Sequence, residues 1–119
     1  GKQITNSKVL VMGATFKENV ADIRNSKVVD VINEFKSFGV EVDVIDPHAD
    51  SEELMKEYGF GLVEKPANDY DAVYVAVNHK EFLDLDEDYF KSITTSGAVI
   101  TDIKGIYKDK IKDLTYWSL

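Results

Sequence analysis

The sequence predicts an α/β fold: a Rossmann-like, doubly wound parallel sheet of five to six strands with helices on both faces, in three αβα layers. Short apolar runs alternate along the chain with segments in which apolar residues recur at helical spacing. Residues 72–77, AVYVAV, are apolar throughout, which is typical of a central strand covered on both faces. Strands that alternate with helices form parallel sheets through right-handed crossovers. We expect the strand order 3-2-1-4-5, with any sixth strand at the edge.

The first elements are defined by changes in apolar period. Residues 8–12 form a short buried strand that Gly13 ends. From residue 26 the apolar positions follow helical spacing, so we expect a helix that Asn25 or Ser26 caps and Gly39 ends. The valines of VEVDVID then alternate, which predicts a second strand ending at the Asp-Pro turn of residues 46–47.

The remaining elements follow the same logic. The expected segments are a helix at 51–58, a brief third strand at 60–63 after a glycine, the central strand at 72–77, a short helix at 86–92, a fifth strand at 98–101 and a terminal edge strand at 115–119. The sequence shows no repeat and no linker, so residues 1–119 form one domain.

Composition limits the function. The chain has 119 residues, 44% of them hydrophobic, and a net charge of −8. An acidic surface argues against nonspecific binding to nucleic acid or to an anionic membrane. The absence of cysteine excludes disulfides, thiolate metal sites and cysteine nucleophiles within the chain. No apolar run approaches the roughly 20 residues of a membrane span, and the expected compartment is the cytoplasm.

Three loops at the carboxyl ends of predicted strands carry cations despite the acidic composition: GATFKENVADIRNS, NHKEF and DIKGIY. In a doubly wound sheet ligands bind at this edge. The first loop has one glycine where a dinucleotide fingerprint needs three, and it contains no G-K-[ST]. It can still bind phosphate through side-chain cations and the amides at the start of the following helix.

Simpler interpretations exist for each candidate residue. Lys17 and Arg24 can instead pair with neighbouring acids on a solvated loop, where such pairs contribute little. We interpret His48 and His79 as turn or surface residues, because no carboxylate-histidine spacing typical of a metal site surrounds them. No metal ligand is assigned. We assign Asp46 to the turn that ends its strand.

The motif GATFKENVADIRNSKVVDVI, followed by VEVDVIDP, resembles the C-terminal, UDP-binding domain of the UDP-glucose/GDP-mannose dehydrogenase family. AVYVAVNHKEF and VITDIKGIY are similar to later motifs of that domain, so the resemblance covers essentially the whole chain. The variant FKEN-x-x-D-I-R-N-S-K most resembles the members that act on UDP-N-acetylhexosamines.

The resemblance implies a substrate-binding domain of an NAD-dependent 6-dehydrogenase, which oxidises the C6 alcohol of a UDP-sugar to a carboxylate in polysaccharide biosynthesis. It implies that NAD is bound mainly by a separate N-terminal domain, that a helical central domain joins the two, and that the full-length enzyme is a homo-oligomer. The family's nucleophile is a cysteine. Because this chain has none, we expect the isolated domain to be inactive, with no catalytic residue of its own.

The resemblance also assigns binding residues. Lys17 matches a residue that contacts the UDP portion of the substrate, and Lys104 lies near a basic residue that, in some relatives, contacts the UDP of a neighbouring subunit. Arg24 matches an arginine that reaches toward the NAD pyrophosphate. Asp22 and Ser26 are expected to hold the loop and cap the helix.

Two functions of other classes compete with this one. The first is a stand-alone nucleotide-binding or regulatory module without chemistry. The second is a receiver-like signalling domain, but the first strand, VLVMG, lacks the paired acids that a receiver carries there. An upstream G-x-G-x-x-G and a cysteine in the same reading frame would favour the dehydrogenase over the module.

Overall fold

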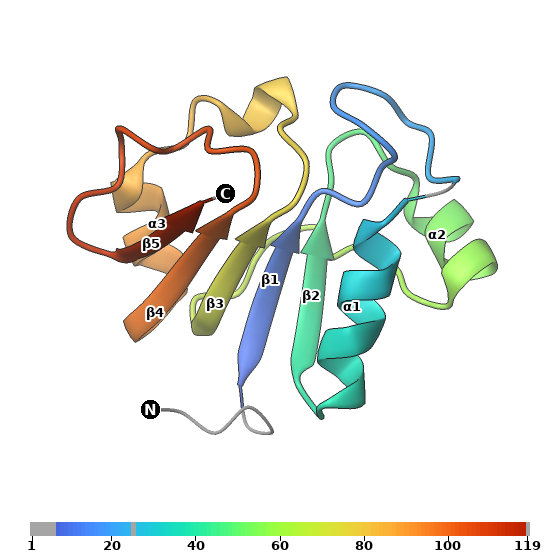
Figure 1. The fold of residues 1–119 in the computed structure, drawn as a ribbon. Helices are drawn as coiled ribbons and strands as arrows, with labels where there is room; N and C mark the ends of the chain where they lie inside the picture. The colour runs from blue at the N-terminus through green and yellow to red at the C-terminus, as the bar shows by residue number, and fades with distance from the viewer. Residues whose placement is uncertain (1–6, 25, 119) are drawn as a thin grey trace.

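Five parallel strands form one sheet in the order β2-β1-β3-β4-β5 (Figure 1). This computed structural model describes residues 7–24 and 26–118. The strands are β1 (Lys8–Met12), β2 (Glu41–Ile45), β3 (Tyr70–Val75), β4 (Thr94–Asp102) and β5 (Thr115–Ser118). Between them lie α1 (Val28–Ser37), α2 (Ser51–Tyr58), a 3-10 turn η2 (Lys80–Phe82) and α3 (Glu87–Ile93). The predicted fold class is confirmed, with β3 at the centre of the sheet as expected for AVYVAV.

The sheet separates two hydrophobic clusters because successive side chains of a strand point to opposite faces. Val9 and Val11 of β1 pack with α1 and α2 on one face. Leu10 and Met12 pack on the other face with Phe90 of α3. Helices therefore cover both faces, and the chain has the predicted three layers.

The strand predicted at residues 60–63 is absent. The amide of Leu62 donates to the hydroxyl of Ser51 at 2.8 Å, whereas the amide of Val63 donates to the carbonyl of Val44 in β2 at 2.9 Å. A ladder needs repeated backbone hydrogen bonds to the neighbouring strand, and within the described residues 60–63 the Val63 amide makes the only one to β2. The Phe60 side chain is buried in the cluster under α2. The other five predicted strands form, and they keep the predicted order. The sheet therefore differs from the prediction only in lacking the outer strand at residues 60–63.

The start of α1 also differs from the prediction. The N-cap residue is Lys27, whose side chain makes no capping hydrogen bond. The hydroxyl of Ser26 is buried and has no hydrogen-bond partner among the described residues, so Ser26 is not the cap. Asn25, the other predicted cap, lies outside the described residues.

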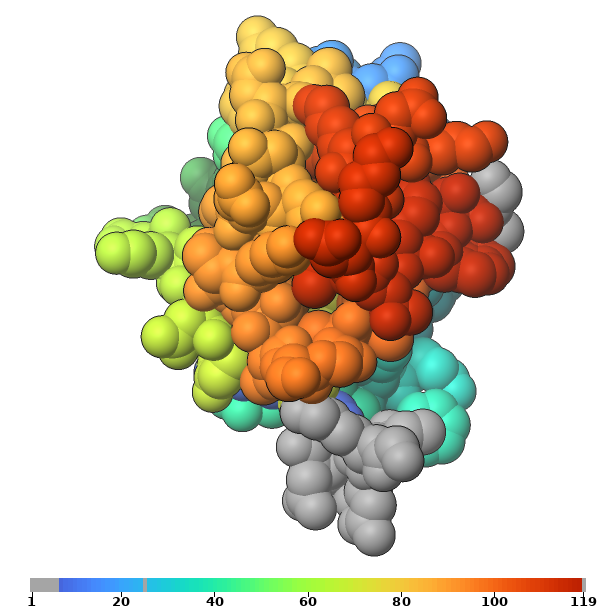
Figure 2. All heavy atoms as spheres, turned by 90° about the vertical axis from the view of Figure 1, so that its left-hand side faces the viewer, coloured from blue at the N-terminus to red at the C-terminus, as the bar shows by residue number. Residues whose placement is uncertain are grey.

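The β5 edge is formed by the C-terminal part of the chain. Viewed onto this edge, residues of the β4–β5 segment and β5 form a continuous surface beside α3 (Figure 2). Trp117 of β5 is 51% exposed on this strand. The expectation that residues 115–119 form a terminal edge strand is confirmed for Thr115–Ser118; Leu119 lies outside the described residues.

Candidate functional site

Three loops meet at the carboxyl edge of the sheet and enclose a cavity of about 340 Å³. They follow β1, β3 and β4, and the first turn of α1 closes the fourth side. The lining residues are Thr15, Phe16, Lys17, Glu18, Lys27, Val28, Val31, Tyr74, Ala76, Val77, Asn78, Ile103 and Lys104. The cavity thus lies where doubly wound sheets bind their ligands.

Glycine at position 13 lets the first loop pass close to the second. Gly13 has a φ of +102°, and a Cβ atom built on it would lie 2.6 Å from the Cβ of Val77. Any other residue would meet both a strained backbone and a clash. The single glycine of the motif therefore serves the close contact of two loops that line the cavity.

Three lysines converge on the cavity from three different segments. Lys17 comes from the β1 loop, Lys27 from the start of α1 and Lys104 from the β4 loop. All three side chains are exposed, and none takes part in an ion pair within residues 7–24 and 26–118. Because the protein carries a net charge of −8, this cluster is a local cationic site on an acidic domain.

One wall of the cavity is apolar and aromatic. Val28, Val31 and Ile103 line it together with Tyr74 of β3. Phe16 also lines the cavity and is 56% exposed, which is unusual for a phenylalanine. The cavity thus offers cations for an anionic group and a flat apolar surface for a planar ring.

Arg24 lies outside this cavity. Its guanidinium donates to both carboxylate oxygens of Asp22, at 3.0 and 3.1 Å, and its side chain is 81% exposed. Through this pair the pKa of Asp22 is lowered. The structure therefore brings Lys17 and Lys104 together and places Arg24 apart from both. The simpler interpretation of a solvated pair describes the contacts of Arg24 and not those of Lys17.

The Lys104 turn is organised by a buried carboxylate. Asp102, at the end of β4, accepts hydrogen bonds from the Tyr107 amide at 2.8 Å and the Tyr116 hydroxyl at 2.6 Å. Burial and the adjacent carboxylate raise the pKa of Tyr116 to about 12. Gly105, at a φ of +69°, completes the turn, and its amide donates to the Asp102 carbonyl. Lys104 thus projects from a tightly bonded turn.

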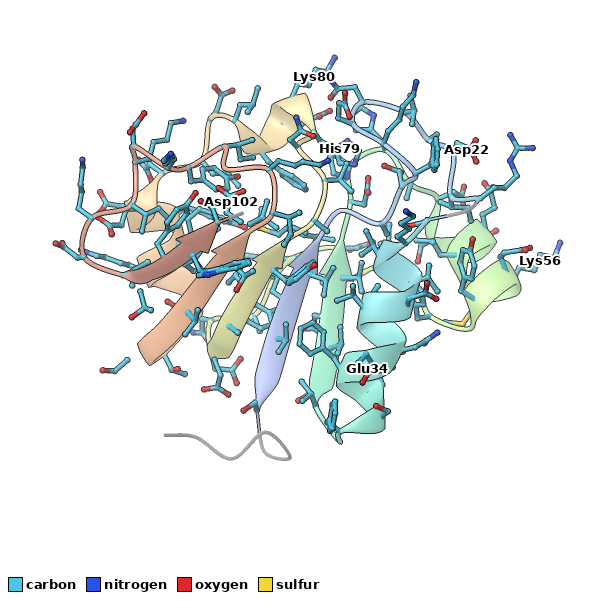
Figure 3. All side chains as sticks on the ribbon, viewed as in Figure 1. Asp22, Glu34, Lys56, His79, Lys80 and Asp102 are labelled. Carbon is cyan, nitrogen blue, oxygen red and sulfur yellow. The ribbon has the colours of Figure 1, made fainter. Side chains whose placement is uncertain are left out.

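His79 is buried, and the prediction of a turn or surface histidine is wrong in this respect. Its side chain has no exposed surface, and its Nε2 lies 2.9 Å from Asp46 Oδ2. Figure 3 shows His79 at the carboxyl edge of the sheet with Asp22, Lys80 and Asp102, whereas Glu34 lies on α1. Asp46 also accepts the amides of His48 and Ala49, which confirms its role in the turn after β2.

A second hollow is larger but lacks cations. It has a volume of about 640 Å³ and lies between α1 and the amino ends of the strands, lined by Ser7, Val9, Asp30, Val31, Glu34, Phe35, Phe38, Val40 and Ala72. Its two charged lining residues are acidic, which disfavours a phosphate group. We call it the apolar hollow. The cavity at the carboxyl edge is the better candidate for an anionic ligand.

The described residues contain neither a metal-binding cluster nor a helix suited to crossing a membrane. No group of three or more histidine, aspartate or glutamate side chains among them is arranged to hold a metal ion. None of the helices in residues 7–24 and 26–118 combines the length and apolar character that a bilayer crossing requires.

Comparison with known proteins points to one family. Residues 10–109 match the UDP-binding domain of the UDP-glucose/GDP-mannose dehydrogenase family. The UDP-N-acetyl-D-glucosamine 6-dehydrogenase of Salmonella typhi is 39% identical over 115 residues, which are 96% of this chain and 27% of that protein. The enzyme of the same name from Pseudomonas aeruginosa is 37% identical, over 93% of this chain and 26% of that protein.

Solved structures share the fold. An NDP-N-acetyl-D-galactosaminuronic acid dehydrogenase from Methanosarcina mazei Go1 superposes with a TM-score of 0.85 at 24% identity, covering 99% of this chain and 25% of that one. The UDP-N-acetyl-mannosamine dehydrogenase of Staphylococcus aureus gives a TM-score of 0.73 at 28% identity, covering 95% of this chain and 26% of that one. The chain thus spans about a quarter of the length of the relatives that it matches. It belongs to the UDP-glucose/GDP-mannose dehydrogenase family, as the UDP-binding domain.

Proposed function

We propose that the cavity at the carboxyl edge binds the diphosphate of a UDP-sugar between Lys17, Lys27 and Lys104. The observation that carries the proposal is the convergence on one cavity of three lysines that have no ion-pair partner among the described residues, in a domain with a net charge of −8. Ammonium groups bind phosphate oxygens through charge-assisted hydrogen bonds. The amides at the start of α1, whose Val28 lines the cavity, add partial positive charge.

The aromatic wall suits the uracil ring. Tyr74 is held in place by an edge contact with Phe35, with ring centroids 6.0 Å apart. Phe16 is exposed beside Lys17 in the same loop, so it can pack on a planar base while the lysine binds the phosphates. Lys27 extends the set of substrate-binding residues beyond those that the motifs indicated.

In the complete protein, we propose, this domain holds the substrate of an NAD-dependent 6-dehydrogenase acting on a UDP-N-acetylhexosamine. The names of the relatives support that substrate class. We assign no dinucleotide site to the described residues, because the β1 loop has no G-x-G-x-x-G and Arg24 lies outside the cavity, paired with Asp22. NAD is therefore proposed to bind mainly elsewhere in the longer protein, with Arg24 directed toward its pyrophosphate.

The chemical step is also assigned to the rest of the longer protein. A thiol nucleophile is needed for the covalent chemistry implied by the family, and this sequence contains no cysteine. We expect the 119-residue chain to produce no NADH from NAD and UDP-sugars. A module without chemistry would share the UDP site, so activity of the longer protein separates the two functions. Homo-oligomeric assembly stays a prediction from the family resemblance, and a cytoplasmic location stays a prediction from the sequence.

Lys17 and Arg24 provide a matched test, because they are cations of one loop and only Lys17 lines the cavity. Replacing Lys17 with Met removes a charge-assisted hydrogen bond worth roughly 1.5–3 kcal/mol, so UDP affinity should fall about 10- to 100-fold. Arg24→Met should leave UDP affinity within about twofold, since its surface ion pair contributes little. Isothermal titration calorimetry of the chain with UDP measures both.

In the longer enzyme, the same two variants distinguish an effect on substrate binding from an effect on cofactor binding. There, Lys17→Met should raise KM for the UDP-sugar, and Arg24→Met should raise KM for NAD. Equal losses of UDP affinity in the two variants, or no UDP binding by the parent chain, would contradict the proposed site.

A further inference from the structure

The loop that carries Lys17 is anchored by the buried side chain of His79, which does not line the cavity. His79 Nδ1 lies 2.9 Å from the amide nitrogen of Asn19, and its Nε2 lies 2.9 Å from Asp46 Oδ2. The His79 side chain has no exposed surface. The histidine therefore bridges the end of β2 and the β1 loop from its own position after β3.

The contacts define one tautomer of the ring. A backbone amide can only donate, so Nδ1 must be the unprotonated acceptor and Nε2 must carry the hydrogen. That hydrogen points to the Asp46 carboxylate. Burial raises the pKa of Asp46, but hydrogen bonds from His79 and from the amides of Ala14 and His48 outweigh burial and lower it. The pair is thus a neutral imidazole held by an ionised carboxylate.

Lys17 lies between two residues that this histidine contacts. Thr15 Oγ1 is 3.2 Å from Nε2, and the Thr15 hydroxyl donates to the Lys17 carbonyl at 2.8 Å. On the other side, the Asn19 amide donates to Nδ1, and Asn19 Oδ1 accepts the amide of Lys80 at 2.7 Å. Lys17 itself is exposed. The conformation of its backbone is therefore set by anchors at both ends.

Asn19 shows that the anchor imposes a particular backbone. Its φ of +60° is the only positive value at a residue other than glycine in the described part of the chain. Asparagine tolerates this left-handed conformation better than most residues but still costs energy there. The two hydrogen bonds from the NHKEF loop compensate that cost and turn the chain back after Lys17.

We propose that His79 is a positioning residue for UDP binding: as the neutral Nε2–H tautomer it fixes Asn19 and thereby directs Lys17 into the cavity. His79 is not among the residues that line the cavity. The inference deepens the proposed function and rests on it for the identity of the ligand. The alternative is a core histidine that stabilises the fold without a specific effect on the loop.

Two substitutions separate the two ring nitrogens. His79→Asn places an amide oxygen near the position of Nδ1 and can still accept from Asn19. His79→Gln places an amide nitrogen near the position of Nε2, which keeps a donor to Asp46 and loses the acceptor for Asn19. Both variants lose the imidazole ring, so each is the other's control for lost packing.

Hydrogen exchange and UDP titration give the two measurements. In His79→Gln we expect the Asn19 amide to exchange about tenfold faster and UDP affinity to fall about tenfold, as for one lost hydrogen bond. In His79→Asn both quantities should stay within about threefold of the parent. Amides of β1 and β3 should exchange alike in the two variants. If the two variants behave alike at Asn19 and toward UDP, His79 has only a structural role.

The parent chain offers a test that needs no mutation. It examines the proposed tautomer of His79 even if neither variant folds. Long-range ¹H–¹⁵N NMR of the His79 ring should show an unprotonated Nδ1, and a protonated Nδ1 would overturn the proposal. Failure of the parent to bind UDP would instead refute the proposed function, while ligand-free exchange at Asn19 would still decide whether His79 holds the loop.

Discussion

Replacing Asp46 with Asn should destabilise the fold strongly, although it only exchanges one carboxylate oxygen for an NH2 group. The side chain of Asp46 has no exposed surface. Oδ1 accepts the amides of His48 and Ala49, and Oδ2 accepts the amide of Ala14 and the Nε2–H of His79. An asparagine has one acceptor oxygen, so its amide group must face two of these four donors.

Two lost bonds to a charged acceptor, at roughly 1.5–3 kcal/mol each, give an expected loss of about 3–6 kcal/mol. Urea unfolding followed by circular dichroism measures this loss. Asp50→Asn is a matched control, because Asp50 caps α2 by accepting the Glu53 amide and asparagine caps equally well. The control should change stability by only a few tenths of a kcal/mol. A loss below about 1 kcal/mol for Asp46→Asn would refute the reasoning.

The same variant has a defined dependence on pH. The pKa of Asp46 is lowered from its ordinary value of 3.8 in the folded state, so the unfolded chain takes up the proton first as pH falls. Its stabilising contribution is therefore complete well above 3.8 and is lost as pH falls through the lower folded value. The difference in stability between the parent and Asp46→Asn should shrink below about pH 4. A difference in stability that stays constant as the pH falls well below about 4 would contradict the assigned charge.

Two further predictions concern the loops around the cavity. Gly13→Ala should cost at least about 2 kcal/mol in urea unfolding, because the new Cβ combines a φ of +102° with a contact of 2.6 Å to Val77; an unchanged midpoint would contradict this. Tyr107→Phe should cost about 1–2 kcal/mol and lower Tm by roughly 4–8 °C, because the buried Tyr107 hydroxyl donates to the Phe82 carbonyl at 2.5 Å. Unchanged thermal unfolding would show that this carbonyl finds another donor.

The fold was predictable where apolar periodicity and burial coincide. The run at residues 72–77 became the central strand β3, and the alternation of valines became β2. The strand predicted at 60–63 failed because hydrogen bonding there depends on Ser51, a contact from another element that a local pattern does not contain. The prediction that Ser26 caps α1 was wrong for a similar reason, since Ser26 is buried by tertiary packing.

The candidate site was predictable in part. The rule that ligands bind at the carboxyl edge of the sheet indicated the loops that line the cavity, and the family motifs indicated Lys17 and Lys104, which the structure places at that one cavity. Lys27 was missed because it stands at the N-cap of α1, where a lysine is usually a solvated residue. His79 was misjudged because its burial depends on Asp46 and Asn19, which are distant in sequence.

The most direct test of the central claim is to locate UDP on the domain by titrating the ¹⁵N-labelled chain and following its amide resonances. The proposed site predicts that the largest shifts fall on residues 15–18, 27–28, 78 and 103–104, which line the cavity. Shifts centred on the apolar hollow or on Arg24, or no shifts at all, would contradict it.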